Sequence, residues 1–256
     1  MLDKWFGLSG KCALVVGASQ GLGREIALAL AQAGADVAGA ARHQEKLEGL
    51  AQEIGALGRR ALSLPMDVTQ EEQVVAMARQ LAEAWSRVDI LVYSAGTLRA
   101  KPTLDSTLAD WYQTLDINLT GAFLVCREVG RLMRQQGGGR IILISSAFGD
   151  RVLPQVLPYV VSKGGLQQMV RNLAFEWARY GIRVNGVAPG YFHTEMPGPA
   201  LADPATREAI LRRIPLRRVG QPPEIGPLIV YLAAPASDFM TGEVIRIDGG
   251  QSYCTV

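Results

Sequence analysis

The sequence predicts an α/β fold: a single domain, residues 1–256, with a doubly wound parallel sheet of about seven strands and helices on both faces. Short apolar runs alternate with longer amphipathic segments along the whole chain, and the runs are apolar at successive positions, as strands buried on both faces are. Apolar residues make up 48% of the chain and charged residues 20%, enough to build a sizeable core. No linker, composition break or internal repeat divides the chain.

Each element follows from this alternation. Strands are expected in the short apolar runs, at 12–16, 37–41, 61–64, 88–93, 140–144, 182–187 and 243–247. Helices are expected in the segments between them, at 22–33, 44–57, 70–85, 107–136, 158–180 and 222–233. Glycines follow several of these helices, as helix ends require. The irregular, proline-containing segment 189–223 departs from the alternation and indicates a substrate lid, which we assign to 191–220.

Charge and cysteine content exclude several classes of protein. A net charge of +2 without a Lys/Arg run argues against a nucleic-acid partner. No apolar run approaches the roughly 18 residues that span a bilayer, and the early Asp3 argues against a signal peptide. Cys12, Cys126 and Cys254 have no metal-ligand spacing, so we expect no metal and three reduced thiols. A cytoplasmic protein is therefore predicted.

A glycine-rich loop lies between the first predicted strand and the first helix, with the spacing G-x-x-x-G-x-G. Glycines allow positive φ angles and a close approach of backbone N–H groups to a ligand. The following helix N-terminus favours a pyrophosphate. A tight strand-to-helix turn with nothing bound is the alternative. The predicted cofactor-binding residues of the loop are Gly17, Ser19, Gln20, Gly21, Leu22 and Gly23.

The end of the second predicted strand bears on the choice of cofactor. Dinucleotide-binding sheets that bind NAD place an acid there for the ribose 2′-hydroxyl. Here Ala41 and Arg42 occupy this place, and an arginine pairs well with a 2′-phosphate, which favours NADP while leaving NAD possible. A solvated arginine at a helix start is the alternative. Asp67 and Val68 are expected beside the adenine, and an N-cap role for Asp67 or Thr69 is equally open.

Two residues at the start of a predicted helix suggest acid–base chemistry. Tyr159 and Lys163 are four residues apart and therefore project from one helix face. A nearby ammonium favours the phenolate form, so we expect Lys163 to lower the pKa of Tyr159. Tyr159 would then act as general acid or base on a carbonyl–alcohol pair, and Ser146 would hydrogen-bond the carbonyl oxygen. A solvated helix face is the alternative interpretation.

These motifs, in this order and spacing, resemble the short-chain dehydrogenase/reductase family, including its 3-oxoacyl carrier-protein reductases and gluconate dehydrogenases. The likeness extends along nearly the whole chain. Besides the glycine loop, the matching residues are Ser94-Ala95-Gly96, Asn118, Ser146, Tyr159, Lys163, Pro189-Gly190 and Thr194, with Thr241-Gly242 and Asp248-Gly249-Gly250 near the C-terminus.

The resemblance implies a Rossmann-type fold and hydride transfer between a nicotinamide cofactor and a carbonyl or secondary alcohol substrate. It implies that Asn118, Ser146, Tyr159 and Lys163 are catalytic, with Asn118 holding a water that relays protons to Lys163. Cofactor contacts are implied for Ser94, Ala95, Gly96, Tyr159, Lys163, Pro189, Gly190 and Thr194. Two positions depart from the family pattern: Val16 replaces a threonine, and Tyr93 replaces an asparagine that braces the sheet.

The lid and two long helices suggest further properties. Arg212, Arg213, Arg217 and Arg218 indicate either an anionic substrate or a solvated helix face, and His193 is expected to pack within the lid.

Surplus apolar residues on the predicted helices 107–136 and 158–180 suggest an outer face that pairs in a homodimer or homotetramer. Residues of that face are expected among Leu119, Phe123, Val129, Leu166, Val170 and Leu173.

The sequence is thus interpreted as an NADP-preferring oxidoreductase with a small-molecule substrate. A non-catalytic dinucleotide-binding sensor or scaffold of the same fold is the alternative of a different class, because fold does not imply function. An epimerase or dehydratase that keeps its cofactor bound is a second enzyme alternative.

Overall fold

Seven parallel strands form one sheet in a computed structural model that describes residues 2–253. The strands are hydrogen-bonded in the order β3-β2-β1-β4-β5-β6-β7. Their bounds are β1 (Cys12–Val16), β2 (Asp36–Ala41), β3 (Ala61–Pro65), β4 (Ile90–Tyr93), β5 (Gly139–Ile144), β6 (Ile182–Pro189) and β7 (Val244–Ile247). The predicted fold class is confirmed, and each predicted strand is present to within two residues at either end.

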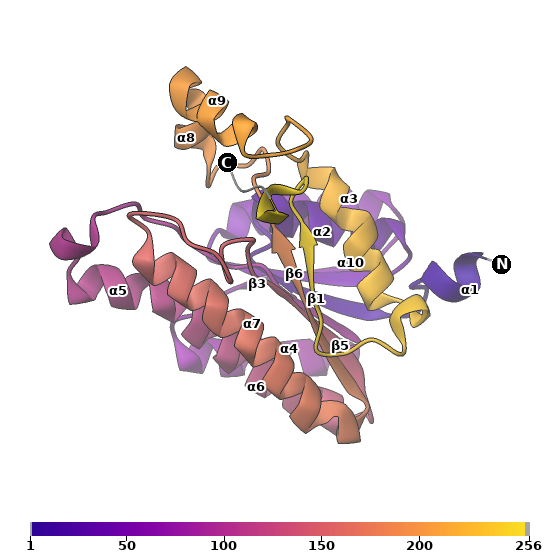
Figure 1. Cartoon of the computed structure of the whole chain (residues 1–256). Helices are drawn as coiled ribbons and strands as arrows, with labels where there is room; N and C mark the ends of the chain where they lie inside the picture. The colour runs from indigo at the N-terminus through magenta and orange to yellow at the C-terminus, as the bar shows by residue number, and fades with distance from the viewer. Residues whose placement is uncertain (1, 254–256) are drawn as a thin grey trace.

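Helices cover both faces of this sheet (Figure 1). One face carries α4 (Glu71–Trp85), α6 (Gly121–Gln135) and α7 (Leu157–Trp177), and the other carries α2 (Gly21–Gln32), α3 (Gln44–Ala56) and α10 (Gly226–Ala233). Within β1, Leu14 and Val16 belong to the first core, and Ala13 and Val15 to the second. Both faces of the strand are buried, which is the physical reason for its uninterrupted apolar run.

The strand order places the site. It reverses beside β1, whose neighbours are β2 and β4, so the connections leave in opposite directions from this point. In open α/β sheets a crevice forms there, outside the carboxyl ends of the strands. The segments that follow β1, β4, β5 and β6 all begin at this edge of the sheet.

The single helix predicted at 107–136 is wrong, because the chain there forms three segments. These are α5 (Leu108–Leu115), a π-helical turn η2 (Asp116–Thr120) and α6. The hydroxyl of Tyr93, which is fully buried, donates a hydrogen bond to the carbonyl oxygen of Ile117 within η2. A carbonyl engaged from outside leaves the regular i→i−4 pattern, as such turns do near functional sites. Tyr93 therefore braces β4 against this helix in place of the family asparagine.

The lid segment contains more regular structure than the sequence suggested. Two short helices, α8 (Gly198–Ala202) and α9 (Pro204–Arg212), lie within it, and they project from one end of the molecule in Figure 1. Asp203 caps α9, since its carboxylate accepts a hydrogen bond from the backbone N–H of Thr206 at 2.8 Å. A further short helix, α1 (Leu2–Phe6), precedes β1 and was not predicted.

The six apolar residues from which an outer face was expected divide between the core and the surface. Val129, Leu166 and Val170 are fully buried inside this chain, where they pack against the sheet. Phe123 is 49% exposed and fits the expectation. Three of the six residues named from the sequence therefore belong to the internal core.

The described residues also bear on the excluded classes. No helix in residues 2–253 is long and apolar enough to cross a membrane. Cys12 and Cys126 are buried free thiols, as expected, whereas Cys254 lies outside the described residues. Among the described residues no group of three or more potential ligands could hold a metal ion.

Close backbone packing fixes the loop between β1 and α2. A Cβ atom at Gly23 would lie 2.1 Å from the carbonyl oxygen of Gly17, and one at Gly17 would lie 2.6 Å from the backbone nitrogen of Ala95. Gly17 also has a φ angle of +85°, which side chains rarely adopt. The absence of a side chain at Gly23 lets α2 approach the loop, and its absence at Gly17 lets the loop approach the segment that follows β4.

We expect Gly23→Ala to lower the free energy of unfolding by about 1–3 kcal/mol, because the added methyl overpacks the backbone. The matched control is Gly49→Ala in α3, where nothing lies within 4 Å of the added Cβ. It should raise stability by about 0.5–1 kcal/mol through helix propensity. Urea unfolding gives the free energy of unfolding of each variant. Equal changes in Gly23→Ala and Gly49→Ala would contradict the packing argument.

Candidate active site

Four polar side chains converge in the crevice at the carboxyl ends of the central strands. Ser146 follows β5, Asn118 lies in η2, and Tyr159 and Lys163 occupy the first turns of α7. Each is at least nine-tenths buried, with exposed fractions from 0% for Asn118 to 8% for Tyr159. The structure thus brings together all four residues predicted as catalytic.

Tyr159 and Ser146 share one hydrogen bond between their hydroxyl groups. The ammonium nitrogen of Lys163 lies 5.7 Å from the centroid of the Tyr159 ring. It donates a hydrogen bond to the carbonyl oxygen of Ile144 at 2.9 Å, so it is anchored to the last residue of β5. The two hydroxyls can therefore meet one substrate oxygen, with a positive charge close behind them.

Asn118 fastens a loop to helix α7. Its side-chain oxygen accepts from the backbone N–H of Thr97 at 2.8 Å, and its nitrogen donates to the Thr97 carbonyl and to the Ser162 hydroxyl, both at 3.0 Å. Gly96 lies between the partners, since a Cβ there would be 3.5 Å from both Asn118 Oδ1 and Lys163 Nζ. The proton-relay role expected for Asn118 stays a prediction.

Three buried polar residues of the site were missed by the sequence reading. The Ser145 hydroxyl donates to the carbonyl of Lys163 at 2.9 Å, and the Gln167 amide donates to the carbonyl of Ser146 at 3.2 Å. Ser162 donates to the carbonyl of Tyr159 at 2.7 Å and also receives Asn118. A signal for Gln167 was available, because residues 159, 163 and 167 follow one helix face.

Burial shifts the two titrating groups in a way that corrects one expectation. The pKa of Tyr159 is raised above its ordinary value because burial disfavours the phenolate, although the hydrogen bond from Ser146 opposes this. Burial likewise lowers the pKa of Lys163 from 10.5 to about 8. The predicted lowering of the Tyr159 pKa by Lys163 is therefore wrong for the protein alone, where desolvation dominates.

The glycine loop has the features that a pyrophosphate requires. Gly17 donates its N–H to the Ala40 carbonyl at 2.7 Å, which holds the loop against the end of β2. Gly21 has a φ angle of +56°, and no side chain caps the N-terminus of α2 at Gln20. The N–H groups of the first helical turn thus lack a side-chain partner and suit an anionic group. These residues fit a dinucleotide.

Near the residues expected beside the adenine, the structure contradicts one interpretation, the N-cap role for Asp67 or Thr69. Asp67 Oδ1 accepts hydrogen bonds from both the backbone N–H and the hydroxyl of Thr69, each at 2.9 Å. Helix α4 begins only at Glu71, after Gln70, so neither Asp67 nor Thr69 is its N-cap. Val68 is buried. Arg42 is exposed just after β2 and has no hydrogen bond or ion pair to any other described residue.

The segment after β6 approaches both the catalytic residues and the glycine loop. The Pro189 carbonyl accepts the N–H of Ala147 at 2.9 Å, and the Gly190 N–H bonds to the Ile247 carbonyl at 3.0 Å. The side chain of Thr194 would lie 3.7 Å from a Cβ on Gly21. Ser94 donates its N–H to the Val16 carbonyl at 2.8 Å. These contacts bring the segments that follow β1, β4, β5 and β6 together at one edge of the sheet.

The lid is anchored by Phe192 rather than by the histidine beside it. Phe192 is 4% exposed and forms a β-bridge with Gly220. His193 donates its backbone N–H to the Gly220 carbonyl at 2.9 Å, but its side chain is exposed. The expectation that His193 packs within the lid is wrong, because the bridge turns the aromatic neighbour inward.

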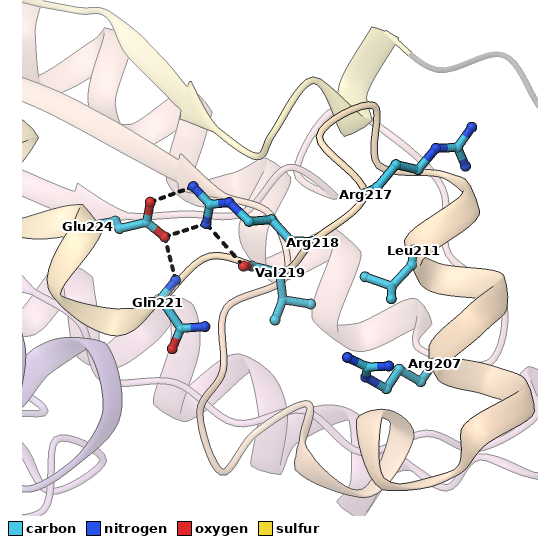
Figure 2. A pocket seen from close by; sticks show the side chains of 7 residues that line it. All are labelled: Arg207, Leu211, Arg217, Arg218, Val219, Gln221 and Glu224. Atoms are coloured by element: carbon cyan, nitrogen blue, oxygen red, sulfur yellow. Dashed lines mark hydrogen bonds and ion pairs between the residues drawn. The ribbon is translucent and has the colours of Figure 1, made fainter.

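The lid arginines divide into paired and unpaired groups. Figure 2 shows Arg218 extending both guanidinium nitrogens to Glu224, each at 2.7 Å, and this charge with the Gln221 N–H lowers the pKa of Glu224 to about 2. Arg212 pairs with Glu208. Arg213 and Arg217 have no carboxylate partner among the described residues. Of the four arginines singled out from the sequence, Arg213 and Arg217 therefore remain candidates for an anionic substrate, and Arg207 on α9 likewise has no carboxylate partner among the described residues.

Beside the Arg218–Glu224 pair, the lid borders an open hollow of about 420 Å³. Its lining combines arginines with two apolar side chains, and it contains none of the four candidate catalytic residues (Figure 2). The lining residues are Arg207, Leu211, Arg217, Arg218, Val219, Gln221 and Glu224. The hollow is therefore separate from the catalytic cluster.

Comparison with known proteins supports one family. Residues 17–252 match a family model described as enoyl-(acyl carrier protein) reductase. The chain is 40% identical over 247 residues to galactitol 2-dehydrogenase (L-tagatose-forming) of Cereibacter sphaeroides, and 35% identical over 245 residues to gluconate 5-dehydrogenase of Gluconobacter oxydans. In both comparisons the match covers 96% of each protein.

A solved structure of a relative has the same fold as this chain. Gluconate 5-dehydrogenase from Burkholderia cenocepacia, in complex with NADP and tartrate, superimposes with a TM-score of 0.96. It is 35% identical to this chain, and the match covers 99% of each. Fold, motif order and these relatives agree: the chain belongs to the short-chain dehydrogenase/reductase family of NAD(P)(H)-dependent oxidoreductases.

Proposed function

We propose that this chain transfers a hydride between NADP(H) and a carbonyl or secondary alcohol substrate, with Tyr159 as general acid and base. The observation that carries the proposal is the buried cluster of Ser146, Tyr159 and Lys163 beside a loop that fits a pyrophosphate. Two hydroxyls that face each other in a water-poor crevice suit one reacting oxygen. The bound nicotinamide supplies the hydride donor or acceptor.

Each residue then has a defined task. Ser146 donates a hydrogen bond to the substrate oxygen, and Tyr159 gives that oxygen a proton during reduction or removes one during oxidation. Lys163 stabilises the phenolate through its charge and is positioned to reach the nicotinamide ribose. Asn118 and Ser162 hold the first turn of α7 against the loop at Thr97. Pro189, Gly190 and Thr194 orient the carboxamide.

Two features support NADP over NAD. The end of β2 has Ala41 and Arg42 in place of a carboxylate, and Arg42 has no partner among the described residues. The Burkholderia relative was crystallised with NADP. We propose that Arg42 binds the 2′-phosphate.

The substrate class follows from the relatives and the lid. The relatives compared above carry the names of dehydrogenases for gluconate and galactitol, both polyhydroxylated. Arg213 and Arg217 are lid cations without a carboxylate partner in the described chain, and they favour an anionic member of that class. We propose a sugar acid, with residues 191–220 acting as its lid.

Exposed aromatic side chains support assembly. Phe123 on α6 and Phe175 on α7 are 49% and 87% exposed, which is unusual for large apolar groups on a monomer. We propose that these helices pair in a homodimer or homotetramer. A cytoplasmic location stays a prediction.

The Lys163 charge gives a pH-dependent prediction. Its pKa is about 8 in the folded chain, against an ordinary 10.5, so between these values the unfolded chain binds one proton more. Stability must therefore rise with pH across this window. We expect wild type to gain up to about 1.4 kcal/mol per pH unit relative to Lys163→Met between pH 8 and 10. Urea unfolding at several pH values gives this difference in stability. The difference between wild type and Lys4→Met, which retains Lys163, should not change over the same window. A difference between wild type and Lys163→Met that stays constant from pH 8 to 10 would contradict the burial argument.

Replacing Tyr159 tests catalysis and separates an enzyme from a cofactor sensor. Tyr159→Phe should reduce turnover by about 10²–10⁴-fold, because the proton donor is lost while the ring packing remains. NADPH binding, measured by fluorescence titration, should be unchanged. Turnover is followed at 340 nm with D-gluconate, galactitol and D-threitol, and exposed Tyr112→Phe serves as control. Full activity of Tyr159→Phe, or no turnover by wild type with any keto or hydroxy substrate, would favour the sensor.

Cofactor preference is tested at the end of β2. Ala41→Asp should lower the kcat/KM for NADP relative to NAD by about tenfold or more, since a carboxylate repels the 2′-phosphate. The same change on the remote, exposed Ala84 should leave the ratio unchanged. An unaltered ratio in Ala41→Asp would count against the NADP assignment.

A further inference from the structure

A lysine on α3 reaches across to the glycine loop. Lys46 lies in the first turn of α3, and its ammonium nitrogen donates a hydrogen bond to the side-chain oxygen of Gln20 at 2.6 Å. Gln20 is the last residue before α2 and belongs to the loop that fits the pyrophosphate. The positive charge of Lys46 is therefore held at the opening between β2 and this loop, where the adenosine ribose of a dinucleotide lies.

The lid determines which end of the Gln20 amide faces Lys46. The Gln20 nitrogen donates a hydrogen bond to Glu195 Oε2 at 2.5 Å. A carboxylate can only accept, so the amide nitrogen must point to Glu195 and its oxygen to Lys46. Lys46 of α3, Gln20 of the glycine loop and Glu195 of the lid are thus joined by two consecutive hydrogen bonds.

The charges around this mouth are not equally compensated. Arg24 on α2 pairs with Glu53 and Glu25. Lys46 has only the neutral Gln20 amide as a partner in the described chain, and Arg42 has none. Arg42 and Lys46 are thus two cations, four residues apart in the chain, with no direct carboxylate partner among the described residues; the Glu195 carboxylate is reached only through Gln20. A hydroxyl does not need two positive charges, whereas a phosphate dianion does.

We propose that Lys46 is a second specificity-determining residue, which Gln20 holds in place to bind the 2′-phosphate of NADP together with Arg42. The inference rests on the proposed NADP preference and extends it to a residue on another element. With a 2′-phosphate present, Lys46 exchanges the neutral amide oxygen for an anionic oxygen. With the 2′-hydroxyl of NAD it stays on Gln20 and adds little affinity.

Two nucleotides that differ only in the 2′-phosphate test the proposal without any substrate. Adenosine 2′,5′-bisphosphate and adenosine 5′-monophosphate are titrated into the full chain by calorimetry. Lys46→Met keeps the apolar stem and should weaken bisphosphate binding by about 5- to 20-fold, the size expected for one charge-assisted phosphate contact. Binding of the monophosphate should change less than about twofold, because it lacks the group that Lys46 binds.

The controls separate this inference from the cofactor preference itself. Lys4→Met removes an equal charge from an exposed site on α1 and should change neither affinity. If wild type binds both nucleotides equally, the proposed NADP preference is contradicted, and so is the proposed role of Lys46 in binding the 2′-phosphate. If wild type discriminates and Arg42→Gln loses this, but Lys46→Met does not, only the role of Lys46 is overturned. Equal loss for both nucleotides in Lys46→Met also overturns it.

Discussion

A lysine ammonium buried at the carboxyl end of the sheet is the constraint on which the site depends. Lys163 is 4% exposed and has no carboxylate partner within residues 2–253; its ammonium donates a hydrogen bond to the carbonyl oxygen of Ile144. A buried charge without an ion pair is costly, which is why its pKa falls toward 8. The same desolvation raises the pKa of Tyr159. Burial therefore moves the two pKa values apart, that of Lys163 downward and that of Tyr159 upward.

Polar bonds around this lysine join the catalytic helix to the sheet. Ser145 bonds to the backbone of Lys163, Asn118 bonds to Ser162, and Tyr93 bonds to the π-helical turn that carries Asn118. Each is a buried group whose loss would leave its partner unsatisfied. Rigid support of this kind keeps two hydroxyls at one point, which a loop-borne site could not do as precisely.

The opposite side of the crevice is built from charges that lie on different elements. The lid neutralises some of its own arginines, as Arg218 with Glu224, and reaches the glycine loop through Glu195. Pairing with carboxylates neutralises two of the five lid arginines, Arg212 and Arg218. Cations without a carboxylate partner among the described residues, such as Lys46, Arg42, Arg213 and Arg217, are where anionic groups of a cofactor or substrate can be recognised.

The sequence by itself determined the doubly wound sheet, the glycine loop and the pairing of Tyr159 with Lys163 on one helix face. Those features are local: apolar periodicity, glycine spacing and the four-residue interval between Tyr159 and Lys163 are visible within short windows, whereas Asn118 was a candidate only through the family resemblance. Only the tertiary structure decided the break in the helix at 116–120, the burial of Val129, the raised pKa of Tyr159 and the line from Lys46 through Gln20 to Glu195. Each of these depends on groups far apart in the chain, because desolvation and hydrogen bonding are set by whichever atoms the fold brings within a few ångströms.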